Sequence, residues 1–320
     1  MSVIAVFPGQ GSQYTKMGKD FYDNFQIAKN VFLEVDDALN FKLSSVIFGD
    51  SEDELKQTHN TQPALMAVSI AIAEVLKSQK GFDATKTSYT AGHSLGEYSA
   101  LCFAKSISLR DTSILLKHRG SSMNMASNDY FGAMAALIGG DDDKINSLID
   151  FAIKNSNSGG SDAVLVAAND NSVGQVVISG SKQSVELAVS NAKSYGIKLA
   201  TILPVSGAFH SPLMKNATTV MQDILGKVSI NAPIIPVIQN VTASKVSSPD
   251  EIKQNLVKQI ESSVKWRQTM LYAQENGVTN LVEIGAKNVL CGLAKRTTPS
   301  INAISIEKVS DIDKIDSMQH

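Results

Sequence analysis

A glycine-rich turn between a short strand and a helix is the feature that most constrains this chain. In Gly92-His93-Ser94-Leu95-Gly96, glycines stand two residues before and two residues after a serine. The preceding Tyr89-Thr90-Ala91 is typical of a strand end, and 95–104 carries apolar residues at helical spacing. Such a turn holds a serine hydroxyl at the edge of a sheet, beside free backbone N–H groups. The segment predicts either a nucleophilic serine or an ordinary glycine-rich strand–helix turn.

Strands and helices alternate along most of the chain, which indicates a mainly parallel sheet. The first strand is a compact apolar run, Val3 to Phe7, closed by Pro8-Gly9 as in a buried strand that ends in a turn. We expect the other strands of this sheet at 89–91, 235–239 and 281–285. We expect helices at 26–39, 62–76, 95–104, 111–126, 250–260 and 265–275, and from about 212. Asp111 is the expected N-cap of the helix at 111–126.

The pattern changes near residue 128, where shorter strands are interleaved with two helices. We expect strands at 132–138, 163–168, 175–179 and 197–205, and helices at 141–154 and 182–195. Asn169-Asp170-Asn171-Ser172 separates the two middle strands, and the order β-α-β-β-α-β matches a ferredoxin-like unit. We therefore predict an α/β fold with two domains. A large α/β-hydrolase-like domain with a mainly parallel sheet spans 1–127 and 204–320, and a ferredoxin-like inserted domain spans 128–203.

Composition and charge exclude several classes of protein. The 320 residues are 43% apolar and 19% charged, with a formal net charge of −2, so nothing favours nucleic acid or an anionic membrane as a partner. Cys102 and Cys291 lie in apolar helical stretches, which favours buried thiols in a reducing compartment. The sequence has neither a signal-peptide pattern nor an apolar run of the roughly 18 residues that a membrane span needs. We therefore expect a cytoplasmic protein.

No pattern in the sequence is typical of a metal or cofactor site. His-x-x-x-His and Cys-x-x-Cys are absent, and Asp141-Asp142-Asp143 favours a helix N-terminus over a metal site. The loop Pro8-Gly9-Gln10-Gly11-Ser12-Gln13 lacks the lysine of a phosphate-binding loop. We predict no metal and no cofactor.

A nucleophilic serine requires a base and donors for the oxyanion that its attack creates. Of five histidines, His210 lies in a loop between an expected strand and an expected helix, where catalytic groups often occur. His93 adjoins the serine, but neighbours in a tight turn point in different directions. The remaining histidines are His59, His118 and His320. His210 is thus either the base or a structural histidine. A backbone N–H of the loop at 8–13 and that of Leu95 are suited to form an oxyanion hole.

Arg119 follows Leu115 and Leu116 by one turn on the apolar side of an expected helix. An unpaired buried guanidinium costs several kcal/mol. The position therefore predicts either an internal salt bridge or a fork that binds a carboxylate or phosphate in bidentate fashion.

Taken together, these segments resemble the malonyl-CoA:acyl carrier protein transacylases of fatty-acid synthesis. The matching segments are 7–13, 92–98, 171–180, 208–214, 283–285 and 290–296, so the resemblance extends over nearly the whole length of the chain. The resemblance implies transfer of the malonyl group from malonyl-CoA to the phosphopantetheine thiol of acyl carrier protein, through a malonyl-serine intermediate. We expect a monomer that binds neither nucleic acid nor membranes.

The resemblance also implies the roles of five catalytic positions. Ser94 is the nucleophile and His210 its base, while the N–H groups of Gln10 and Leu95 bind the oxyanion. Gln259 matches the glutamine that takes the place of the triad acid and helps to orient the histidine. Ser262-Ser263 follows where many relatives have Asn-Pro, which affects the local shape near Gln259.

Substrate selection is implied for three further residues. Arg119 binds the free carboxylate of the malonyl group, and Phe209 goes with malonyl rather than methylmalonyl selection in related polyketide acyltransferases. Met123 is also assigned to the substrate site. Because carrier proteins are acidic, we expect basic residues near the mouth of the site. The candidates are Lys215, Lys295 and Arg296.

Three other functions use the same residues. A serine hydrolase or thioesterase with this Ser–His pair would place its acid between them in chain order, where Asp162, Asp170 and Glu186 lie. A stand-alone acyltransferase of a polyketide pathway is the second alternative. The third is a carrier-protein-binding module without activity.

Overall fold

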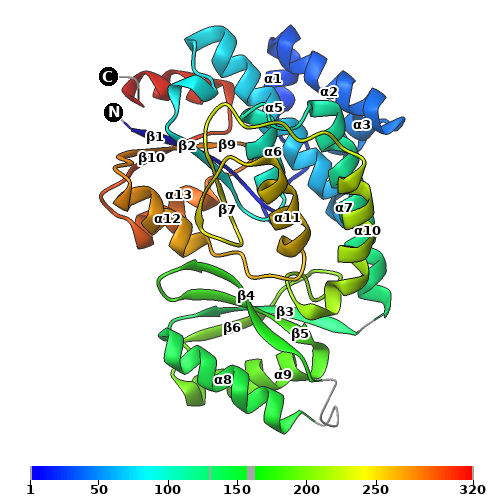
Figure 1. The fold of residues 1–320 in the computed structure, drawn as a ribbon, viewed down its shortest axis with the longest axis vertical. Coiled ribbons are helices and arrows are strands. Elements are labelled where there is room, and N and C mark those ends of the chain that lie inside the picture. Colours follow the sequence, from blue (N-terminus) through cyan, green and yellow to red (C-terminus); the bar gives the residue numbers. More distant parts are fainter. Residues whose placement is uncertain (1, 130, 157–162, 319–320) are drawn as a thin grey trace.

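A six-stranded sheet lies at the centre of the larger part of the molecule (Figure 1). The structure is a computed structural model and describes residues 2–129, 131–156 and 163–318. In order across the sheet, the strands are β10 (Asn302–Ile306), β9 (Asn280–Ile284), β1 (Val3–Phe7), β2 (Tyr89–Gly92), β7 (Val237–Gln239) and β8 (Ser244–Val246). The strands from β10 to β7 are parallel, and β8 pairs antiparallel with β7 at one edge. The predicted α/β fold with a mainly parallel sheet is confirmed.

Strand β1 is buried along its whole length because helices cover both faces of the sheet. Successive side chains of a strand point to opposite faces. Accordingly, Val3, Ala5 and Phe7 belong to one apolar core, and Ile4 and Val6 belong to the other. The predicted buried strand at 3–7 is confirmed.

The helices of this part divide between the two apolar cores. The first core contains residues of α1 (Lys19–Asn24), α2 (Gln26–Leu39), α3 (Leu43–Phe48), α4 (Glu52–Lys56), α5 (Thr58–Lys80), α6 (Gly96–Phe103), α7 (Leu109–Asp129), α10 (Lys215–Gly226) and α11 (Pro249–Gln259). The second contains residues of α12 (Trp266–Glu275) and α13 (Val289–Thr297). Short 3₁₀ segments lie at Ala84–Lys86, Ala192–Tyr195, Pro212–Met214 and Val309–Met318. Most of these helices match the expected ones to within a few residues.

A second sheet is built from the segment between α7 and α10, and all of its strands pair antiparallel. Its order is β4 (Leu165–Ser172), β5 (Gln175–Ser181), β3 (Gly132–Ile138) and β6 (Leu199–Ile202). Helices α8 (Asp142–Asn155) and α9 (Lys182–Asn191) cover the face that points away from the six-stranded sheet (Figure 1). A separate apolar core fills the space between this sheet and its helices.

Two local predictions are wrong. Asp111 is not the N-cap of α7, because the helix begins earlier and the Oγ of Ser108 accepts the Asp111 N–H at 3.0 Å. The Ser108 hydroxyl in turn donates to the Oδ2 of Asp111 at 2.7 Å. Residues 169–172 do not separate the middle strands but continue β4. The turn instead lies at Val173-Gly174, with a φ of +71° at Gly174.

Short or mixed elements were not predicted. Strands β8 and β10 lie at the edges of the large sheet, and edge strands need no continuous apolar run. Helices α1, α3 and α4 span no more than six residues each, too few for a helical repeat to stand out.

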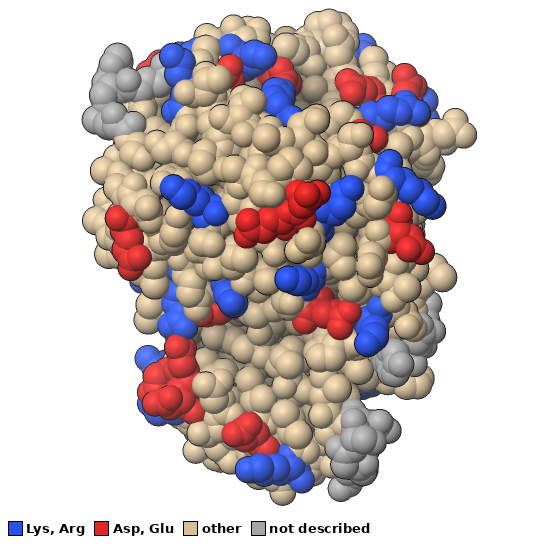
Figure 2. All heavy atoms as spheres, in the orientation of Figure 1, with Lys and Arg blue, Asp and Glu red and all other residues tan. Residues whose placement is uncertain are grey.

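Acidic and basic side chains are interspersed over the face seen in Figure 2, and neither sign forms one large patch there.

Candidate active site

Ser94 lies on a tight turn between the end of β2 and the start of α6. Its backbone φ is +53°, a conformation that residues other than glycine rarely adopt. A Cβ on Gly92 would lie 1.9 Å from the Gly96 carbonyl carbon, and a Cβ on Gly96 would lie 2.2 Å from the Phe7 oxygen. Both glycines are therefore required by close backbone approach. The predicted strand–turn–helix is confirmed.

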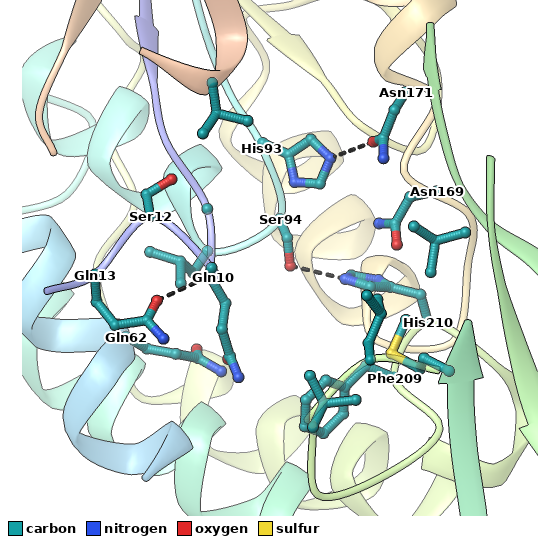
Figure 3. Close-up of a pocket in the computed structure, with 18 of the residues that line it drawn as sticks. Gln10, Ser12, Gln13, Gln62, His93, Ser94, Asn169, Asn171, Phe209 and His210 are labelled. Atoms are coloured by element: carbon teal, nitrogen blue, oxygen red, sulfur yellow. Dashed lines mark hydrogen bonds between the residues drawn. The ribbon is translucent and has the colours of Figure 1, made fainter. Parts of the chain in front are cut away.

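The hydroxyl of Ser94 contacts the predicted base. The Ser94 Oγ and the Nε2 of His210 are 2.7 Å apart, although 116 residues separate them in the chain (Figure 3). The Nδ1 of His210 lies 2.8 Å from the main-chain oxygen of Gln259. A ring that donates from Nδ1 to a carbonyl has Nε2 free to accept a proton. Burial, together with the charge of Arg119, lowers the pKa of His210 to about 3, so its imidazole is neutral at pH 7.

Gln259 contacts the histidine through its main chain and not through its side chain. Its Oε1 accepts from the Nη2 of Arg119 at 2.9 Å, and its Nε2 donates to the main-chain oxygen of Ser94 at 3.1 Å. The carbonyl orients the ring without placing a negative charge beside it.

The acids that a hydrolase triad would use lie elsewhere. Asp170 accepts from Arg267 and Gln268 of α12. Glu186 pairs with Lys182 across one turn of α9. Asp162 lies outside the described residues. Within the described part of the chain, no carboxylate contacts His210.

The two predicted oxyanion donors both line the cavity beside Ser94. Leu95 directly precedes α6, so its N–H points from the positive end of a helix. Among the residues that the structure describes, no acceptor occupies the main-chain N–H of Gln10 or of Leu95. Both groups are therefore available to an oxygen in the cavity.

Arg119 is fully enclosed, with 1% of its surface exposed, yet it lines the same cavity. Its Nη1 donates to the Oε1 of Gln62 at 2.8 Å, and its Nη2 lies 3.1 Å from the Oγ of Ser94. Its Nε has no partner among the described residues, and none of the ion pairs found there includes it. Burial lowers the pKa of Arg119. A buried guanidinium with no carboxylate beside it is poised to bind an anionic ligand.

The cavity has a volume of about 320 Å³ and lies between the two sheets. Phe209 and Met123, both predicted to contact substrate, line it together with Val177 and Leu203. Figure 3 shows Phe209 beside His210 at its lower rim. The cavity combines these apolar side chains with polar ones such as Gln10 and Gln62, a combination typical of a small-molecule site.

Strand β4 supplies the polar wall of the cavity. Asn169 and Asn171 line it, and the Oδ1 of Asn171 lies 2.8 Å from the Nε2 of His93. The intervening Asp170 points away and forms an ion pair with Arg267 at 2.8 Å. This alternation is the reason that 169–172 form a strand: the long-range pairing of their side chains outweighs their local turn preference.

Two contributors to the site were not predicted. Gln62 holds the guanidinium of Arg119, and Asn240 contacts the main chain of the serine turn. Each is fully or almost fully buried. Gln62 follows the polar residues His59, Asn60 and Thr61 at the start of the predicted helix, so no local pattern marked it. The other histidines lie apart: His59 is in the first turn of α5, His118 is on α7, and His320 lies outside the described residues.

Neither a metal-binding cluster nor a membrane-spanning helix occurs within the described ranges. There, no group of three or more His, Cys, Asp or Glu side chains is arranged to hold a metal ion. The same residues include no helix with the length and apolar character that crossing a membrane requires.

A model of the acyl transferase domain matches residues 4–318, so this chain belongs to the acyl transferase family. Malonyl CoA-acyl carrier protein transacylase of Bacillus subtilis (strain 168) is 40% identical over 314 residues, 98% of this chain and 96% of that protein. The chain is therefore an acyltransferase, and the resemblance found in its motifs is confirmed.

Solved structures agree with this assignment. The crystal structure of acyl-carrier-protein-S-malonyltransferase from Bartonella henselae gives a TM-score of 0.93 at 43% identity, covering 100% of this chain and 99% of that chain. A further structure is described as a type II PKS acyl-carrier protein in complex with its malonyl-transacylase. Its TM-score is 0.91 at 37% identity, over 98% of each chain.

Proposed function

We propose that this chain transfers the malonyl group from malonyl-CoA to the phosphopantetheine thiol of acyl carrier protein, and so supplies fatty-acid synthesis. One observation carries the proposal: the Ser94 Oγ contacts both the Nε2 of His210 and the Nη2 of Arg119, at 2.7 and 3.1 Å. A nucleophile thus lies next to its base and next to a cation that forms no ion pair with any described residue.

In the first half-reaction, the Ser94 Oγ attacks the thioester carbonyl while its proton passes to the Nε2 of His210. The carbonyl oxygen becomes an oxyanion and accepts hydrogen bonds from the N–H groups of Gln10 and Leu95. Each such donor is typically worth about 3 kcal/mol of the barrier. The carbon–sulfur bond then breaks, and coenzyme A leaves with the proton from His210. The product is malonyl-Ser94.

The second half-reaction repeats these steps with the carrier's thiol as nucleophile. His210 accepts the thiol proton, the sulfur attacks the malonyl-serine carbonyl, and the bond to the Ser94 oxygen breaks. The proton returns to that oxygen, which restores the free serine. The neutral state of His210 at pH 7 supports its use as a base in both halves.

We propose that Arg119 selects the malonyl group through its free carboxylate. An acetyl group offers no anion and would leave the buried guanidinium without a charged partner. Phe209 and Met123 line the cavity beside it and limit its size. Transfer is favoured over hydrolysis because His210 is oriented by a neutral carbonyl. A carboxylate there would stabilise the imidazolium and strengthen the base toward water.

The finer division of the fold is also a proposal. The strand order β4-β5-β3-β6 supports a ferredoxin-like inserted domain at 128–203. The parallel sheet with the serine turn after β2 supports an α/β-hydrolase-like domain at 1–127 and 204–320.

Of the basic candidates for carrier binding, Arg296 donates to Gln175, which lines the cavity. Cys102 and Cys291 are free thiols, which supports a cytoplasmic location.

Intact-protein mass spectrometry after brief incubation with malonyl-CoA tests the function. We expect one malonyl adduct on the wild type, none on Ser94→Ala, and little adduct with acetyl-CoA. Addition of the phosphopantetheinylated carrier of fatty-acid synthesis removes the adduct, and a polyketide carrier tested in parallel distinguishes the pathways. Continuous release of coenzyme A without an acceptor would instead identify a hydrolase. Absence of both adduct and release would identify a binding module.

A further inference from the structure

We propose that Asn240 is a positioning residue that holds the backbone of Ser94 in its reactive conformation. The proposal rests on the proposed function, because it concerns the same serine. Strands β2 and β7 are parallel neighbours, with Ala91 opposite Ile238. The residue that follows β7 therefore lies beside the turn that follows β2. Asn240 occupies that place and is fully buried.

The side-chain amide of Asn240 bridges the main chain on both sides of His93. Its Oδ1 accepts the N–H of Ser94 at 2.8 Å, and its Nδ2 donates to the carbonyl oxygen of Gly92 at 2.7 Å. These two bonds fix the direction of the peptide groups that lead into Ser94. They act where the backbone is strained, since the φ of Ser94 is +53°.

Only an amide of this size satisfies both contacts. An aspartate keeps the acceptor for the Ser94 N–H but places a carboxylate oxygen against the Gly92 carbonyl. An alanine leaves two buried main-chain groups without partners. The amide also has a fixed orientation, because its oxygen faces a donor and its nitrogen faces an acceptor.

Glu97 in turn holds Asn240. Its Oε2 accepts the main-chain N–H of Asn240 at 2.7 Å, and its Oε1 accepts from the Nε2 of Gln239 at 2.9 Å. Glu97 lies in the first turn of α6, the helix that the serine turn begins. The contacts therefore close a ring from the turn to α6, to the end of β7, and back to the turn. Burial raises the pKa of Glu97 to about 7.

The same amide also reaches the substrate side of the site. The Oδ1 of Asn240 lies 3.3 Å from the Nε2 of Gln259, whose Oε1 accepts from Arg119. Arg119 is also held by Gln62, whose contact does not involve Asn240, so we expect that contact to remain in a variant without Asn240. Loss of Asn240 should therefore displace the Ser94 Oγ from His210 while binding of the malonyl carboxylate is retained.

The test compares Asn240→Ala with Asn255→Ala in single-turnover acylation by malonyl-CoA. Asn255 is a matched control, because it is also a buried amide, 4% exposed, and contacts Gln239 rather than the turn. We expect Asn240→Ala to lower the acylation rate about 100-fold, the scale of a small displacement of a reacting group. Its KM should change less than threefold, and its malonyl-to-acetyl preference should be retained. Asn255→Ala should acylate within threefold of wild type.

Three outcomes would overturn the proposal: acylation by Asn240→Ala at the wild-type rate, an equal loss in Asn255→Ala, or a loss confined to KM. Melting temperatures of both variants separate reduced folding from reduced reactivity. Asn240→Asp matches asparagine in size and supplies the same comparison if the alanine variant does not fold. It should also acylate slowly, because it lacks the donor to Gly92. A wild-type protein that forms no adduct would reject the proposed function itself, which is a separate result.

Discussion

The Nη2 of Arg119 lies 3.1 Å from the Oγ of Ser94, so a buried cation and a nucleophile share one corner of the cavity. Gln62 and Gln259 hold the guanidinium there from two other directions. A substrate with a carboxylate close to its thioester carbonyl can engage both residues at once.

Substitution of Arg119 should reverse the acyl preference. Arg119→Ala should lower the rate of malonyl-serine formation about 150- to 5000-fold, because removal of one partner of a buried charge pair costs about 3–5 kcal/mol. Acetyl transfer should rise in relative terms. Arg119→Lys, which keeps the charge but not the planar guanidinium, is the control. Its rate of malonyl-serine formation should lie between those of the wild type and Arg119→Ala. Adduct formation from malonyl-CoA and acetyl-CoA measures both rates, and an unchanged malonyl preference would reject the assignment.

Loss of Gln62 should weaken malonyl binding without affecting the Ser–His pair. Gln62→Ala removes a hydrogen bond to a charged group, worth about 1.5–3 kcal/mol, so KM for malonyl-CoA should rise about tenfold or more. Asn60→Ala is a control on the same helix, since Asn60 is a buried amide that contacts Lys117 instead. Steady-state kinetics of the two variants give the comparison. An equal rise in KM for both would mean that the effect comes from α5 as a whole.

Acylation should remain fast at mildly acidic pH. Burial lowers the pKa of His210 to about 3, so its Nε2 stays unprotonated well below the pH at which an ordinary histidine titrates. The single-turnover rate at pH 5.5 should lie within twofold of the rate at pH 7.5. A half-maximal rate near pH 6.5 would contradict this.

The same shift affects stability. The unfolded chain binds a proton at this histidine near pH 6.5, whereas the folded protein does not until about pH 3. The contribution of His210 to the free energy of unfolding therefore becomes less favourable as the pH falls from 6.5 toward 3. Replacement of His210 by glutamine should make the urea-unfolding free energy depend less steeply on pH over this window. An unchanged slope would show that the ring is not buried neutral.

Glycine at position 96 is required for folding of the serine turn. Gly96→Ala should lower the free energy of unfolding by at least about 2 kcal/mol, because its Cβ would overlap the backbone oxygen of Phe7. Gly292→Ala is the control: it lies within α13 with nothing within 4 Å of the added carbon. That change should stabilise the protein by about 0.5–1 kcal/mol through helix propensity. Thermal or urea unfolding measures both, and equal effects would contradict the argument.

Much of the fold could be predicted because its signals are local. The apolar run at 3–7, the helix at 26–39 and the strand at 132–138 have the predicted bounds, since each carries its own periodicity. The N-cap of α7 was misplaced because Ser108 and Asp111 both satisfy local capping rules, and only the path of the backbone distinguishes them. The strand at 169–172 could not be predicted, because Asp170 and Asn171 find their partners far away in the sequence, in Arg267 of α12 and in His93.

The turn that carries Ser94, the loop that carries His210 and the family of the chain could all be recognised from the amino-acid sequence. Those signals reside in short runs of residues whose backbone requirements are local. Three contacts became visible only in the folded chain: the main-chain oxygen of Gln259 with His210, Gln62 with Arg119, and Asn240 with the serine turn. Each of these contacts joins segments at least 49 residues apart. Their geometry depends on the packing of parallel strands and helices, which no local pattern specifies.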